Sequence, residues 1–379
     1  MKSGNRFSLF HLTAALEALL LLALLFLLTP AGKQAAAAGA AASAGESSSE
    51  AAEAEGEEGE DRIRWVDFDV TAEAMKQAFR YDVDTYLQEV HLRWIELLAY
   101  LGAKYGGDFS LYQPADMDAA AERLLQGESM EAVASGMQQY PYYLEAYEAV
   151  LGGMVGEYRI EIPASEAPDF AAPKDQEGNP LAPEERTGKV WVTKYGLKAF
   201  SPIAKNFAYT DYDDFGTSRS YGYSRRHLGH DLLGQVGTPV IAVESGYVEV
   251  MGWNTYGGWR LGIRSLDGKR YYYYAHLRQN APYHPSVQEG GRVQAGDVIG
   301  YLGRTGYSTQ ENTNNIEVPH LHFGIQLIFG DAQREEEPEI WIDCYELVRF
   351  LEMNRSETVR DGETKEHSRV YQMEDLAVR

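Results

Sequence analysis

The stretch VPHLHFGIQL, residues 318–327, decides the fold of the second half of the chain. After its proline it has the small, apolar and aromatic residues of a β-strand, and no turn signal comes before Phe329-Gly330. It also carries His320 and His322. Side chains of a strand alternate between two faces, so residues two apart share one. The stretch therefore predicts an apolar strand that presents two imidazoles side by side.

Other strand-like runs surround this stretch and predict a β-rich domain over residues 188–350, closed by a helix near Cys344. Asp267-Gly268 lies between two of the runs and is a hairpin signal. The runs are residues 190–192, 240–243, 247–251, 261–264, 270–275 and 298–302.

Two more segments of this domain carry histidines: RRHLGHDLLGQVGTPVIA, residues 225–242, and YYYYAHL, residues 271–277. A catalytic zinc needs three protein ligands and one open position. His227, Asp231 and one histidine of the 318–327 pair would supply two imidazoles and a carboxylate. His276 and the other histidine of the pair could then orient water or stabilise an oxyanion. Because His-x-x-x-Asp spacings also arise by chance, spacing alone leaves a structural role open.

The order of these motifs resembles the lysostaphin-type zinc endopeptidases, which cut peptidoglycan. The family pattern is His-x-Gly-x-Asp, Gly-Thr-Pro-Val, Tyr-x-His-Leu, Gly-x-Thr-Gly-x-Ser and His-Leu-His-Phe. The corresponding motifs here are His227-Leu-Gly229-His-Asp231, Gly237-Thr-Pro-Val240, Tyr274-Ala-His276-Leu277, Gly303-Arg-Thr-Gly306-Tyr-Ser308 and His320-Leu-His322-Phe323. The resemblance covers the β domain and not the helical half.

This resemblance implies an open antiparallel β architecture and one zinc per chain, held by His227, Asp231 and His322. It implies that His276 and His320 are the catalytic histidines. The implied reaction is hydrolysis of peptidoglycan peptide bonds by attack of a metal-bound water, as part of cell-wall remodelling. A non-catalytic, membrane-anchored scaffold or activator of the same fold is the alternative, although such relatives typically lose ligands and this chain keeps all of them.

Three features depart from the family pattern. Residues 309–319 form an inserted polar loop that we expect beside the substrate groove. The Gly257-Gly258-Trp259 segment replaces a Gly-Asn pattern, and Gly324 stands where an acidic residue is frequent, so a partner of the metal ligands differs there.

Further candidates for the substrate groove are Tyr272, Tyr274 and Arg226. Tyr272 and Tyr274 share the strand parity of His276 and are predicted to line the groove, with sheet packing as the alternative. Arg226 is a candidate for binding a substrate carboxylate. His230 points away from Asp231 on an extended segment, which favours a surface role or a supporting role behind the ligands.

The first half of the chain has helical periodicity over residues 62–162. Ser129 is a plausible helix cap and Pro141 a plausible helix start. Residues 163–187 contain several prolines and are predicted to be a linker, and residues 351–379 a loose charged tail.

The role of the helical domain is open. Glu96 lies in an apolar helix and could be the acid of a glycan-cleaving site, but no motif supports that interpretation. Spacing, substrate positioning or binding of a regulatory protein partner is favoured instead.

The N-terminus indicates the compartment. Within residues 1–32, Lys2 and Arg6 precede the unbroken apolar run 18–28, which is typical of a membrane anchor or a signal peptide. Residues 33–61 are rich in Ala, Gly, Ser and Glu and are predicted to be a disordered spacer. We expect an extracytoplasmic protein anchored to the membrane, or one secreted after signal cleavage.

The net charge of −23 argues against nucleic acid as a partner, because phosphate binding relies on Lys and Arg. The single cysteine excludes an intrachain disulfide. The fold class predicted for the chain is an α+β multidomain protein, with a membrane segment, an all-α domain and a β-rich open antiparallel metallopeptidase domain.

Overall fold

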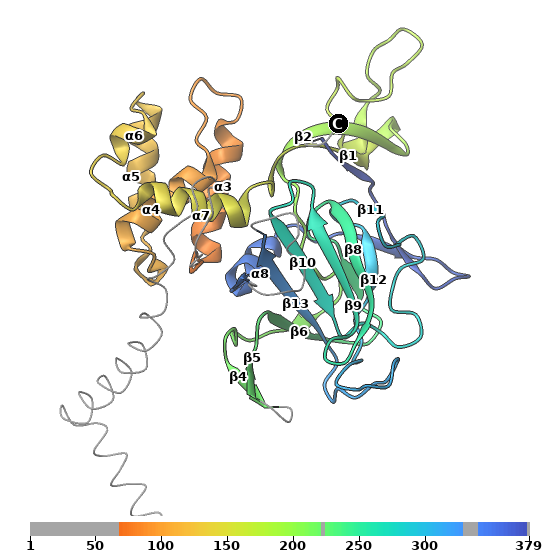
Figure 1. Cartoon of the computed structure of the whole chain (residues 1–379). Coiled ribbons are helices and arrows are strands. Elements are labelled where there is room, and N and C mark those ends of the chain that lie inside the picture. Colours follow the sequence, from red (N-terminus) through yellow and green to blue (C-terminus); the bar gives the residue numbers. More distant parts are fainter. Residues whose placement is uncertain (1–67, 221–223, 329–339, 377–379) are drawn as a thin grey trace, which may run out of the picture. The chain divides into compact units, whose positions relative to one another are not determined.

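The computed structural model describes residues 68–220, 224–328 and 340–376, which Figure 1 shows as coloured ribbons. The predicted helical region comes first and is confirmed. Ser129 caps α6 by accepting a hydrogen bond from Ala132 N at 3.3 Å, and Pro141 lies in the first turn of α7. The helices are α3 (Ala72–Thr85), α4 (Trp94–Tyr105), η1 (a 3-10 turn, Phe109–Leu111), α5 (Pro114–Leu125), α6 (Met130–Val133) and α7 (Tyr140–Leu151).

The predicted boundary of the helical domain at residue 162 is wrong. Residues Val155–Pro163 form strand β1, which pairs along its whole length with β2 (Lys189–Leu197). After Gly152-Gly153 and Met154, residues 155–162 read VGEYRIEI, an extended run whose pattern fits a strand better than a helix. Residues 163–187 are therefore the connection between two paired strands, with 3-10 turns at Ala164–Glu166 (η2) and Pro183–Glu185 (η3), and not a linker between domains.

The β-rich antiparallel domain is confirmed. Its main sheet has the strand order β11-β8-β9-β10-β13-β6-β3, with β14 also pairing β13. The Asp267-Gly268 turn joins β9 to β10, and Gly268 has the positive φ of 77° that such a turn requires. The strands are β3 (Tyr209–Thr210), β6 (His230–Gly234), β8 (Gly246–Asn254), β9 (Gly258–Ser265), β10 (Arg270–Ala275), β11 (Arg292–Val293), β13 (His320–Leu327) and β14 (Ile340–Ile342).

Shorter pairs complete the β structure. β4 (Ser218–Ser220) pairs with β5 (Ser224–Arg226), and β7 (Pro239–Ile241) pairs with β12 (Val298–Tyr301). The helix predicted near Cys344 is α8 (Tyr345–Leu351). In Figure 1 β13 lies between β10 and β6, so the stretch with the paired histidines is an inner strand.

The predicted loose tail is also wrong as far as residue 376. β15 (Thr358–Arg360) pairs with β16 (His367–Arg369), and β17 (Met373–Asp375) pairs with β1. The Lys198 ammonium lies 2.7 Å from the Asp375 carboxylate, and both side chains are buried. The charged residues of this segment predicted a solvated tail, but one of them, Asp375, forms a buried ion pair with Lys198, the residue that follows β2.

The helical part packs on the β part through α8 and the main sheet. The backbone amide of Ala72 donates to the Glu346 carboxylate at 2.6 Å, and the Phe350 ring contacts Phe79 and Trp94. Buried residues of both parts belong to one hydrophobic cluster.

Within the part of the chain that the structure describes, no helix combines the length and apolar character needed to cross a membrane. The predicted anchor or signal segment, residues 1–32, and the predicted spacer, residues 33–61, lie outside the described residues.

Candidate metal centre

The register between β13 and β6 brings Asp231 and His322 together. His322 lies directly opposite Asp231 in the antiparallel ladder, and His320 lies opposite Leu233. Residues opposite one another project from the same face of a sheet. The other face of β13 is apolar and fully buried, with Leu321, Phe323, Ile325 and Leu327. One face of β13 therefore packs in the core, and the other face carries His320 and His322. This explains why an apolar stretch contains two histidines.

His227 reaches the same point from the segment that leads into β6. Gly229 lies within that segment, and a Cβ there would come 2.7 Å from ring atoms of His322 and from the Phe323 carbonyl oxygen. Because carbon atoms do not approach so closely, only glycine lets the segment pass beside the imidazole. The glycine in His-x-Gly-x-Asp is therefore a packing requirement.

Three ligand atoms converge at this point. His227 Nε2 lies 3.1 Å from Asp231 Oδ1 and 3.0 Å from His322 Nδ1, and the last two atoms are 2.9 Å apart. A tetrahedral zinc with bonds of about 2.0–2.2 Å would space its ligand atoms by roughly 3.3 Å. No other group of three such side chains gathers this closely in the described ranges. The three residues therefore fit a zinc-sized cation.

Electrostatics favour the ligand forms of the three groups. Burial favours the protonated form of Asp231, but its close polar contacts with His227 and His322 outweigh burial and hold the pKa of Asp231 well below its usual range. Burial lowers the pKa of His322, against an opposing effect of Asp231. The carboxylate is thus ionised and the His322 imidazole neutral at neutral pH, as metal binding requires.

Asp214 contacts His227 at the ring nitrogen that does not face the other two ligands. His227 Nδ1 lies 3.0 Å from Asp214 Oδ1, so its N–H donates to this carboxylate and the Nε2 lone pair faces Asp231 and His322. Sequence reasoning did not find Asp214. The only available signal was the run of acids Asp211, Asp213 and Asp214 ahead of β4, which matches no motif.

His276 and His320 form a second pair beside the first group, with ring centroids 4.8 Å apart. His276 Nδ1 donates to the Thr305 carbonyl at 2.9 Å, and His320 Nδ1 donates to the Val318 carbonyl at 2.8 Å. A ring of this pair that is neutral therefore keeps the lone pair of its Nε2. Burial, with His320 and His322 adding to it, lowers the pKa of His276 well below its ordinary value, so this ring is neutral.

The prediction that Tyr272 and Tyr274 line the groove is wrong. Both are fully buried on the other face of β10: the Tyr272 hydroxyl donates to Glu244, and the Tyr274 hydroxyl accepts from the backbone amide of Val243. Alternation fails at His276 because its φ of 61° is left-handed and turns its side chain to the opposite face. Tyr273 lies on the site's face instead, with its ring 5.9 Å from that of His322.

Two other candidates lie apart from the centre. Arg226 is exposed at the end of β5 and is not among the residues that line the pocket described below. His230 points away from Asp231, as predicted, but it is not a surface residue. It is buried, and its Nε2 lies 3.0 Å from Asp211 Oδ2.

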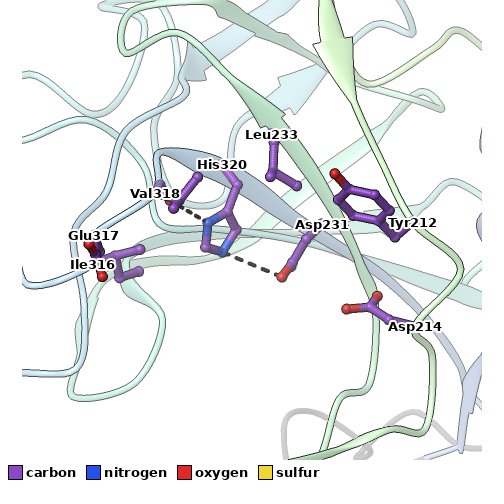
Figure 2. A pocket seen from close by; sticks show the side chains of 8 residues that line it. All are labelled: Tyr212, Asp214, Asp231, Leu233, Ile316, Glu317, Val318 and His320. Carbon is purple, nitrogen blue, oxygen red and sulfur yellow. Dashed lines mark hydrogen bonds and ion pairs between the residues drawn. The ribbon is translucent and has the colours of Figure 1, made fainter.

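A pocket of about 320 Å³ adjoins the centre. In Figure 2 His320 lies between Val318 and Asp231, and its Nε2 is 3.6 Å from Asp231 Oδ2. The inserted loop supplies one wall, so its predicted position beside the groove agrees with the structure. The lining residues are Tyr212, Asp214, Asp231, Leu233, Ile316, Glu317, Val318 and His320.

The antiparallel sheet, the two imidazoles and carboxylate around one point, and the neighbouring pair of histidines define a metal-dependent hydrolase centre. Comparison with known proteins finds that residues 225–334 match the model of Peptidase family M23. The predicted resemblance is confirmed for this part of the chain. The family is zinc-dependent, so the predicted cofactor is confirmed at the level of the family.

The similar proteins described next each match only a part of this chain. An L-Ala--D-Glu endopeptidase of Bacillus subtilis (strain 168) is 37% identical over 149 residues, 39% of this chain and 44% of that protein. Glycyl-glycine endopeptidase ALE-1 of Staphylococcus capitis is 38% identical over 114 residues, 28% of each. The solved catalytic domain of lysostaphin from Staphylococcus simulans is 30% identical and covers 37% of this chain and 92% of that domain, with a TM-score of 0.28. This chain spans less than half the length of these two curated relatives.

Proposed function

We propose that this chain is a zinc endopeptidase that hydrolyses peptide bonds of peptidoglycan and takes part in cell-wall remodelling. The observation that carries the proposal is the triangle of His227 Nε2, Asp231 Oδ1 and His322 Nδ1, with sides of 2.9–3.1 Å. The family match and the peptide bonds named in the relatives' descriptions support the substrate class.

Each residue has a distinct role in this proposal. His227, Asp231 and His322 hold one zinc per chain, and zinc there supplies a Lewis acid that polarises a carbonyl and lowers the pKa of water. His320 and His276 point their Nε2 atoms away from the carbonyl partners of Nδ1. A neutral Nε2 can take a proton from the attacking water or, once protonated, donate a hydrogen bond to the developing oxyanion.

The proposal includes location and partners. Peptidoglycan lies outside the cytoplasm, and the basic start and apolar run within residues 1–32 support membrane anchoring, or secretion after signal cleavage. A regulatory protein is the proposed partner of the helical region, because no residue of α3–α7 lines the pocket described above.

Two variants test the assignment of roles. His322→Ala removes a ligand and is expected to abolish both zinc content, about one ion per wild-type chain, and cleavage of purified peptidoglycan. His320→Ala leaves all three ligands and is expected to keep zinc while turnover falls by at least about a hundredfold, the scale of general acid–base catalysis. Zinc is measured by elemental analysis and cleavage by mass spectrometry of released fragments.

The outcomes separate the two functional classes. Normal cleavage by His322→Ala would refute the assigned centre. Zinc-loaded wild-type protein that releases no fragments after prolonged incubation would favour the alternative, a non-catalytic wall-binding scaffold or activator of the same fold.

A further inference from the structure

The pocket beside the metal centre has two acidic sides. Figure 2 shows Ile316 and Glu317 on one side of it and Tyr212 and Asp214 on the other, with His320 and Asp231 between them. Because Asp231 belongs to the metal centre and His320 to the catalytic pair, any side chain in this pocket belongs to a residue close to the bond being cut.

The size of the pocket suits one long side chain. Its volume of about 320 Å³ lies at the lower end of the roughly 300–1,000 Å³ typical of ligand pockets. Leu233, Ile316 and Val318 give it apolar walls. A glycine or alanine residue would leave most of this apolar surface uncovered, whereas a chain of methylene groups would cover it.

The charges of the lining favour a cation. The Asp214 carboxylate already accepts a hydrogen bond from His227. The Glu317 carboxylate, in contrast, has no hydrogen bond or ion pair among the described residues. Within the described ranges, Arg304 donates only to the main-chain carbonyl of Glu317, and neither Lys nor Arg is among the residues that line the pocket. A buried aliphatic chain that ends in an ammonium would place its charge beside Glu317.

We propose that this pocket is a subsite for a diamino-acid side chain, such as lysine, in the peptide being cut, with Glu317 receiving its terminal ammonium. The inference rests on the peptidase function proposed above. Ile316, Glu317 and Val318 come from the inserted loop 309–319, so the subsite belongs to this chain's departure from the family pattern. Two hydrogen bonds to the main chain hold the wall in place: Ile316 N donates to the Arg304 carbonyl at 3.2 Å, and the Val318 carbonyl accepts from the Nδ1 of the His320 side chain.

The test removes the Glu317 charge from the protein and the lysine charge from the substrate, separately and together. The probes are a purified lysine-containing stem peptide of peptidoglycan and the same peptide acetylated on the lysine amine, which removes its charge. Wild-type holoenzyme is expected to favour the free amine by about tenfold in kcat/KM, the scale of one charge-assisted hydrogen bond. Glu317→Gln is expected to lose this preference while it keeps its zinc.

Glu311→Gln is the matched control, because Glu311 is an exposed acid of the same loop outside the pocket lining. It should keep the wild-type preference. A general effect of the size of the acetyl group would affect all three proteins equally. The informative quantity is therefore the change in the ratio of kcat/KM for the free-amine peptide to kcat/KM for the acetylated peptide. Equal preference in wild type and Glu317→Gln would overturn the subsite while cleavage itself still supported the peptidase.

Calorimetric binding of the two peptides separates the two proposals when no cleavage occurs. If wild type discriminates between the peptides in binding and Glu317→Gln does not, the subsite stands and the peptidase function fails. If neither binding nor cleavage discriminates, the subsite is overturned.

Discussion

At the scale of single residues, Asp214 decides how His227 presents its ligand atom. Its carboxylate accepts the Nδ1 proton of His227 at 3.0 Å and so fixes the tautomer in which Nε2 is free. Carboxylates in this position typically account for about 10–100-fold in metal affinity. We therefore expect Asp214→Ala to weaken zinc binding by that range, measured by competition with a chromophoric chelator.

Asp211→Ala is the control for that change. Asp211 also lies 3.0 Å from a histidine nitrogen, but its partner is His230, which is not part of the metal centre. Zinc affinity should stay within about twofold of wild type, since surface or distant changes rarely exceed ±0.5 kcal/mol. An equal loss in both variants would mean that Asp214 acts through folding and not through His227.

His276 makes the stability of the metal-free protein depend on pH. Its pKa is lowered in the folded state, mainly by burial, so below about pH 6.5 the unfolded chain binds a proton that the folded chain does not. Stability is therefore lost as pH falls through 6.5, by at most about 1.4 kcal/mol per pH unit for one group. His276→Asn, which tolerates the left-handed φ, should flatten this dependence in thermal unfolding of the chelator-treated protein between pH 7.5 and 5.5. An unchanged slope would contradict the assignment.

At the scale of elements, the features predicted correctly are those that neighbouring residues determine. Alternation of side chains and turn residues predicted the strands around β13, the Asp267-Gly268 hairpin and the capped helices. They did not predict β17, because a three-residue strand with two charged residues becomes stable only through partners more than 150 residues away, as in its pairing with β1 and in the Lys198–Asp375 ion pair. For β1 the extended pattern was present in the sequence, and its partner β2 follows after residues 164–188. The parity argument for Tyr272 and Tyr274 failed for a different, local reason: His276, directly after β10, has a left-handed φ that turns its side chain to the opposite face.

The inserted loop is an element that supports the catalytic pair. Asn312 Oδ1 accepts from Trp259 Nε1 and from Asn280 N, both at 2.8 Å, and its Nδ2 donates to Asn280 Oδ1 at 2.7 Å. These bonds fix the turn that follows His276. We expect Asn312→Ala to lower turnover about tenfold at unchanged zinc content, because small displacements of a positioned group are costly.

Thr309→Ala is the comparison for Asn312→Ala. Thr309 is an exposed residue of the same loop with no hydrogen bond among the described residues. Its replacement should leave turnover unchanged in a fragment-release assay. Loss of zinc in Asn312→Ala, or equal losses of turnover in both variants, would show that the loop does not act by positioning His276.

At the scale of the whole molecule, the helical part and the sheet share interior groups. Arg270 is fully buried and donates to both oxygens of Glu244, at 2.9 and 3.1 Å, and to the carbonyl of Ala149 in α7 at 2.9 Å. Glu244 also accepts from the Tyr272 hydroxyl. One guanidinium therefore ties α7 to the sheet that carries the metal centre, and the two parts should unfold in one transition.

Removing this guanidinium should destabilise the whole molecule. Arg270→Met leaves Glu244 buried without its cation, which typically costs about 3–5 kcal/mol, and it removes the bond to Ala149. Urea unfolding followed by far-ultraviolet circular dichroism and by tyrosine and tryptophan fluorescence should give a lower midpoint.

Arg123→Met is the matched control, because Arg123 pairs with Glu128 on the surface of the helical part and its loss should leave the midpoint unchanged. The double variant Arg270→Met with Glu244→Gln should recover part of the loss, since it removes the unpaired charge. If Arg270→Met unfolds at the wild-type midpoint, the joint between α7 and the sheet does not depend on this residue.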